Sequence, residues 1–181
     1  MHTHDLGTGD AMTDVQWGGD NRLLLPSADG YCYIYDAERI AEGPIASFDA
    51  GGEAVKCGRF GFGDVVAMAG RDGAIRLFDS RMAGKSSRLN NPILSIASAH
   101  KKTRQSGSMV SGLQFVPNQQ HQLLSIGQPD YNINMWDLRY TKTSTPSQVI
   151  TNPTTFGKRT RAFVDICCSP DGTSLYAVNS N

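Results

Sequence analysis

The feature that most constrains the fold of this chain is a repeat of short apolar segments, each ending in an aspartate. Asp36, Asp79 and Asp137 occupy equivalent points of three copies, 43 and then 58 residues apart. The apolar segments are rich in Val, Ile, Leu, Phe and Tyr, and Gly, Asn, Asp and Pro separate them. This pattern predicts β-strands and leaves no room for a long amphipathic helix. The sequence therefore predicts an all-β chain.

Each repeat unit contains segments for four strands. In the first unit these segments are AMTDVQW, RLLLPSADG, YCYIYD and PIASF, and the later units repeat the order. Units of four antiparallel strands with a period of roughly 40 to 45 residues are typical of β-propeller blades. We expect blades at 11–50, 54–100 and 109–151, an incomplete blade at 161–181, and a basic linker at 101–108. About three and a half blades cannot close a ring, so we expect the chain to be part of a larger propeller.

The ends of the third strands carry a family resemblance. The sequence MWD at 135–137 matches the signature dipeptide of WD repeats, and His100 stands at the usual histidine position before that unit. Tyr35 and Phe78 replace the tryptophan in the other copies. The chain thus resembles a WD-repeat protein, which implies an incomplete WD40-type β-propeller.

The same resemblance implies a buried network of hydrogen bonds in the third unit. Such a histidine is expected to be structural and not a general base, because buried polar groups in proteins are usually hydrogen-bonded to one another. The tetrad consists of His100, Ser125, Asp130 and Trp136.

A charged element, which we call D-x-R, closes the third strand of two consecutive units. LFDSR ends at Arg81 and MWDLR ends at Arg139. One copy is explained by a salt bridge to the preceding aspartate, worth about 0 to 1 kcal/mol when exposed. Two copies resemble the doubled pattern with which substrate receptors of cullin-four ubiquitin ligases bind the DNA-damage-binding adaptor, and a planar guanidinium suits that task. The adaptor-binding residues implied are Phe78, Asp79, Arg81, Trp136, Asp137 and Arg139.

Charge is distributed unevenly along a chain of zero net charge. Residues 1–79 carry 13 acidic and 6 basic side chains, whereas residues 80–164 carry 2 and 11. Six of these bases lie in two connections between units, which emerge on the rim opposite the D-x-R elements because strands of a blade alternate in direction. We expect a substrate-binding patch there, although solvated side chains without a partner are the simpler alternative. The patch comprises Lys101, Lys102, Arg104, Lys158, Arg159 and Arg161.

Four segments narrow the resemblance to one family. Together they resemble the middle blades of the denticleless family: GRDGAIRLFDSR (70–81), the basic linker that follows SAH (98–100), MWDLRY (135–140) and the stretch from 155 to 181. That family recognises proteins bound to the replicative sliding clamp on DNA and directs their ubiquitination. The resemblance implies a nuclear substrate receptor in replication and cell-cycle control, with the adaptor and clamp-bound proteins as partners and an indirect association with DNA. The alternative is a non-catalytic WD-repeat scaffold in a chromatin or RNA assembly.

Enzymatic, metal-binding and membrane functions are not favoured. The glycine-rich GRFGFGD at 58–64 joins two expected strands and precedes no helix, so it does not predict a phosphate loop. No nucleophile motif or C-x-x-C spacing occurs, and no apolar run approaches the roughly 18 residues of a membrane span. We expect no catalytic residue, cofactor, metal or membrane contact. Direct nucleic-acid binding is the rival for the basic loops, but the sequence shows no interleaved aromatic stacking platform near Lys101 or Arg159.

Overall fold

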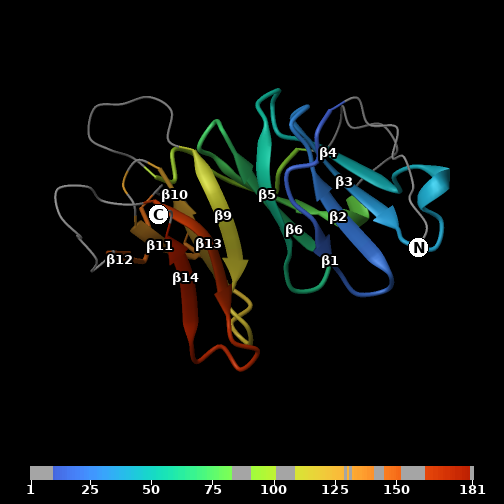
Figure 1. Ribbon diagram of the computed structural model, residues 1–181. Coiled ribbons are helices and arrows are strands. Elements are labelled where there is room, and N and C mark those ends of the chain that lie inside the picture. Colours follow the sequence, from blue (N-terminus) through green and yellow to red (C-terminus); the bar gives the residue numbers. More distant parts are fainter. Residues whose placement is uncertain are drawn as a thin grey trace.

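The computed structural model describes residues 10–82, 91–100, 109–128, 130, 132–140, 145–151 and 162–179. Four antiparallel sheets stand side by side in chain order, from the blue amino-terminal sheet to the red carboxy-terminal one (Figure 1). The first three sheets have four strands each and the fourth has two, and in each sheet the strands follow the order of the sequence. The predicted all-β fold class is thus confirmed. Within the described part of the chain, no helix is long and apolar enough to cross a bilayer.

The strand bounds are as follows. The first sheet consists of β1 (Gln16–Trp17), β2 (Arg22–Pro26), β3 (Tyr31–Asp36) and β4 (Ala46–Asp49). The second consists of β5 (Val55–Phe60), β6 (Val65–Gly70), β7 (Ile75–Asp79) and β8 (Leu94–Ile96). The third consists of β9 (Val110–Phe115), β10 (Gln122–Gly127), β11 (Asn132–Asp137) and β12 (Gln148–Thr151), and the fourth of β13 (Phe163–Cys168) and β14 (Leu175–Asn179). Short 3-10 helices η1 (Ile40–Glu42) and η2 (Ser80–Met82) follow β3 and β7.

The second strand of a sheet is buried on both faces. In β6, Val66 and Met68 pack into a cluster shared with the first sheet, while Ala67 and Ala69 pack into a cluster shared with the third sheet. Successive side chains of a strand point to opposite faces, so a strand between two neighbouring sheets must be apolar at every position. This explains why the segment VVAMAG is a continuous apolar run and not an alternating one.

An aspartate shapes the turn between the second and third strands of each complete sheet. Asp29, Asp72 and Asp130 each accept the backbone N–H two residues further on, at 2.9, 3.0 and 3.3 Å. In the first two turns a glycine follows, with φ of 90° at Gly30 and 74° at Gly73, where a residue with a Cβ would be strained. The three carboxylates therefore start from equivalent positions, although their other partners differ.

The first strand is shorter than the predicted segment at 11–17. Only Gln16–Trp17 forms β1, and Met12 makes an isolated bridge to Ser27. Pro26 on the facing strand has no N–H to donate, so a regular ladder is interrupted there. Thr13 bridges the interruption, because its hydroxyl donates to the carbonyl oxygen of Val55 at 2.6 Å and ties this segment to the second sheet.

The two-stranded fourth sheet exposes large apolar side chains. Val164, Tyr176 and Val178 are 54%, 61% and 60% exposed, whereas Phe163 and Ile166 on the opposite side pack against the third sheet. Apolar side chains on the outer face of a terminal sheet are expected where a propeller is incomplete.

Candidate docking site

Both D-x-R elements have the same side-chain geometry. The guanidinium of Arg81 donates from Nε to Oδ1 of Asp79 at 3.0 Å and from Nη2 to Oδ2 at 2.7 Å. Arg139 and Asp137 repeat this arrangement at 2.9 and 2.7 Å. The arginine side chains are 72% and 57% exposed. Each element therefore presents an exposed guanidinium in a fixed orientation.

The backbone holds the same aspartates in place. The N–H of Arg81 donates to Asp79 Oδ1 at 3.0 Å, and the N–H of Arg139 donates to Asp137 Oδ1 at 3.1 Å. The same carboxylate thus closes the turn after the third strand and also orients the arginine side chain. In the first sheet Asp36 closes the equivalent turn, but the residue two positions on is Glu38. That sheet presents no guanidinium at the equivalent position.

The arginines lower the pKa of the paired carboxyl groups. Hydrogen bonds from Arg139 lower the pKa of Asp137 to about 2, and those from Arg81 lower the pKa of Asp79 below its ordinary value. A carboxyl group whose pKa is depressed in the folded protein contributes fully to stability above its ordinary pKa near 3.9. This contribution is lost as the pH falls through the pKa of the folded state. The bidentate pairing at Asp137 is therefore retained down to about pH 2.

We expect this pKa to return toward the ordinary value when the guanidinium is removed. In Arg139→Ala the carboxyl group of Asp137 should titrate at a higher pH than in the unchanged protein, as measured by the ¹³C chemical shift of the labelled carboxyl. Arg39→Ala, an exposed arginine at the same edge of the first sheet, is the control and should leave that titration unchanged. Equal midpoints in the Arg139→Ala variant and the unchanged protein would contradict the pairing.

Phe78 and Trp136, which precede the two aspartates, lie in the interior. They are 1% and 2% exposed, and each packs in the cluster between its own sheet and the preceding one. The Phe78 ring lies 5.0 Å from that of Phe48, measured between centroids. These two predicted adaptor-binding residues cannot touch a partner directly, because their side chains are covered. They can support docking only by fixing the position of the aspartate that follows.

The predicted tetrad residues are joined by hydrogen bonds in the third sheet. The indole Nε1–H of Trp136 donates to Ser125 Oγ at 2.9 Å, and Ser125 Oγ lies 2.8 Å from Nε2 of His100. Nδ1 of His100 lies 2.8 Å from Oδ1 of Asp130. A consistent donor order runs from the indole to the serine, from the serine hydroxyl to the imidazole, and from Nδ1–H to the carboxylate. Because His100 follows the second sheet and is fully buried, the network fixes the connection between the sheets.

The equivalent aspartates of the first two sheets use other partners. Asp29 accepts from the Tyr33 hydroxyl at 2.7 Å, and Asp72 lies 2.6 Å from Arg76 Nη1. Both contacts join residues of a single sheet. In the described residues only the third sheet combines its turn aspartate with a buried histidine from the preceding connection.

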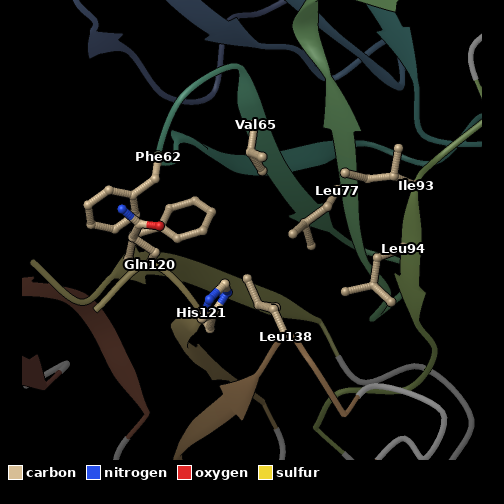
Figure 2. A pocket seen from close by; sticks show the side chains of 9 residues that line it. Phe62, Val65, Leu77, Ile93, Leu94, Gln120, His121 and Leu138 are labelled. Carbon is tan, nitrogen blue, oxygen red and sulfur yellow. The ribbon is translucent and has the colours of Figure 1, made fainter. Parts of the chain in front are cut away.

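A groove opens between the second and third sheets, next to the D-x-R elements. Its volume is about 410 Å³. Figure 2 shows Val65, Leu77 and Leu94 of the second sheet facing His121 and Leu138 of the third. Phe62, Ile93, Phe115 and Gln120 complete the lining. The sequence did not predict this groove, because its walls come from segments far apart in the chain. The one available sequence signal for an apolar surface here is the leucine of MWDLR, at the position where LFDSR has serine.

No cluster of three or more metal-ligating side chains occurs among the described residues. Cys32 and Cys57 are buried free thiols, and burial raises the pKa of both, to about 12 for Cys57. A thiol with so high a pKa forms little of the thiolate that acts as a nucleophile.

Comparisons with known proteins identify the fold. The solved WD40 β-propeller domain of Doa1 matches with a TM-score of 0.65 and 18% identity, over 94% of this chain and 48% of that one. The fold is that of a WD40 β-propeller. Cell division cycle protein cdt2 of Schizosaccharomyces pombe is 31% identical over 113 residues, which cover 60% of this chain and 23% of that protein. No family model matches the chain. The predicted resemblance to WD-repeat proteins, most similar to the denticleless family, is confirmed.

In this WD40 propeller the sheets are blades, and their connections lie on two rims. The turns after β7 and β11 and the turns leading into β6 and β10 share one rim, where Arg81 also lies 3.4 Å from Asp64. We call this the D-x-R rim. The six side chains of the predicted basic patch lie outside the described residues; they are Lys101, Lys102, Arg104, Lys158, Arg159 and Arg161.

Proposed function

We propose that this chain forms part of a substrate receptor of a cullin-four RING ubiquitin ligase. It docks on the DNA-damage-binding adaptor through the D-x-R rim and recruits proteins bound to the sliding clamp, in the nucleus, during replication and the cell cycle. The observation that carries the proposal is the identical, exposed geometry of Arg81 and Arg139 on neighbouring blades. The similarity to cdt2 supports the same assignment, and the matched segment covers 23% of the length of cdt2.

Stability alone does not account for the two D-x-R pairs. Exposed ion pairs contribute about 0 to 1 kcal/mol each, and the first blade has a 4.0 Å contact between Arg39 and Asp36 in place of a D-x-R pair. A docking role accounts for the geometry of these pairs. The bidentate bond to the aspartate occupies Nε and Nη2 of the arginine and leaves its Nη1 amino group outside the pairing. A carboxylate or backbone carbonyl of a partner can accept from that amino group, and little side-chain freedom is lost on binding.

The proposed role is binding, without catalysis by this chain. The hydrogen-bonded histidine of the tetrad is fully buried, and the two interior thiols have raised pKa values. The experiment that tests the role is recovery of the adaptor with the intact protein and with its Arg81→Ala/Arg139→Ala variant. Recovery of chromatin or RNA assemblies without any adaptor would instead favour the scaffold alternative.

Substrate recognition is proposed for the opposite rim, at the basic patch. Reversing all six charges should reduce capture of a clamp-bound substrate while leaving adaptor recovery unchanged, because the two rims are separate. Substrate capture by the unchanged receptor should also weaken as salt rises from about 0.05 to 0.5 M, since the Debye length falls from roughly 14 to 4 Å. Undiminished capture by the charge-reversed receptor would place substrate recognition elsewhere in the protein.

A further inference from the structure

The groove between the second and third blades, which we call the interblade groove, is continuous with the D-x-R rim. Leu138 in its wall is the middle residue of the second D-x-R element, between Asp137 and Arg139. On the other side, the groove residues Phe62 and Val65 flank Asp64, which contacts Arg81. The groove therefore adjoins both D-x-R elements.

The chemistry of the interblade groove favours one kind of occupant. Leucine, isoleucine, valine and phenylalanine side chains form most of its lining, and Ile93 at its edge is 59% exposed. A volume of about 410 Å³ accommodates a large apolar side chain. Outside the groove, Arg81 and Arg139 each retain an Nη1 amino group beyond the internal bidentate bond. The surface thus combines an apolar recess with cationic hydrogen-bond donors close to it.

We propose that the interblade groove receives a large apolar side chain of the adaptor, carried beside a carboxylate that accepts from Arg139. The inference rests on the proposed function and adds to it the chemistry of the partner segment. Burial of the apolar side chain supplies binding free energy, and the flanking charge-assisted hydrogen bond fixes the orientation. Interfaces of this kind are dominated by a buried central anchor surrounded by polar contacts.

The chain offers a matched pair of substitutions. Ile93 and Ile45 occupy equivalent positions directly before the fourth strand of their blades, where each backbone N–H donates to the third strand at 2.8 Å. They are 59% and 47% exposed. Ile93→Asp places a carboxylate at the groove edge, whereas Ile45→Asp places the same charge on a blade without a D-x-R element.

We expect Ile93→Asp in the intact receptor to weaken adaptor binding about 10-fold or more, and Ile45→Asp to change it less than about 2-fold, in equilibrium binding to purified adaptor. Gln120→Trp, which fills the groove from an exposed lining position, should weaken binding in the same way. Normal binding by Ile93→Asp and Gln120→Trp, with loss in the arginine double variant, would overturn the groove inference and leave the proposed function standing. Normal binding by all three would overturn both.

A second measurement does not depend on variant stability. A cysteine introduced by Gln120→Cys should be protected from alkylation when the adaptor is bound, as read by peptide mass spectrometry. A cysteine introduced by Glu38→Cys, at the same rim of the first blade, should remain reactive. Equal alkylation of the Gln120→Cys protein with and without bound adaptor would also overturn the inference.

Discussion

Arg81→Ala combined with Arg139→Ala is expected to reduce adaptor recovery to background while the propeller stays folded. Both side chains are largely exposed and make no contact in the three apolar clusters, so their removal leaves the interior intact. Removing one partner of a close charged contact typically costs 2 to 5 kcal/mol of binding, on the order of 30-fold or more in affinity. Two such losses should be severe.

Two controls separate docking from general charge effects. Arg39→Ala removes an exposed arginine from the equivalent edge of the first blade, where the contact to Asp36 is 4.0 Å, and should leave adaptor recovery unchanged. Replacing Arg81 and Arg139 by lysine keeps the charge but removes the planar fork, and should restore binding only in part. Wild-type recovery of the adaptor by a folded alanine double variant would refute the proposed function.

His100→Ala is expected to cause a large loss of stability. It removes a fully buried ring, leaves a cavity between the second and third blades, and deprives Ser125 and Asp130 of a partner. Cavity formation and the unsatisfied polar groups together should lower the free energy of unfolding by about 3 kcal/mol or more. The shift of the urea midpoint of the intact protein measures it.

Tyr33→Phe is the matched control for the tetrad. It removes the hydrogen bond to Asp29, the equivalent aspartate of the first blade, without breaking a connection between blades. The expected cost is about 1 kcal/mol. A loss for His100→Ala no larger than for Tyr33→Phe would show that the network does not hold the blades together.

Local sequence patterns were sufficient to predict the fold class. Strand segments such as those of β6 and β10 can be recognised in the sequence, because burial on both faces requires a continuous apolar run between turn residues. The repeated aspartates also mark equivalent turns, and Asp79 and Asp137 occupy equivalent strand ends in the structure. The shortening of the first strand was not predicted, since it depends on Pro26 facing the segment from the neighbouring strand.

The candidate site could be predicted only in part. In the sequence, Arg81 and Arg139 can be recognised by their spacing from the aspartates that end the repeated apolar segments. The sequence does not indicate that Phe78 and Trp136 point inward, away from the rim. The interblade groove depends on the packing of two blades and has no linear motif. Adaptor binding by the D-x-R elements and substrate binding by the basic patch stay predictions.

The rigid attachment of each guanidinium to its own blade has a consequence for selectivity. Because both arginines are oriented by aspartates at equivalent strand ends, the rotation from one blade to the next sets the separation between them. A partner that offers two acceptors at that separation gains the second contact as an intramolecular event, at a high effective concentration. A partner that offers one acceptor gains only one of the two contacts. Two contacts at a fixed separation can thereby discriminate between acidic surfaces that would bind a single arginine equally well.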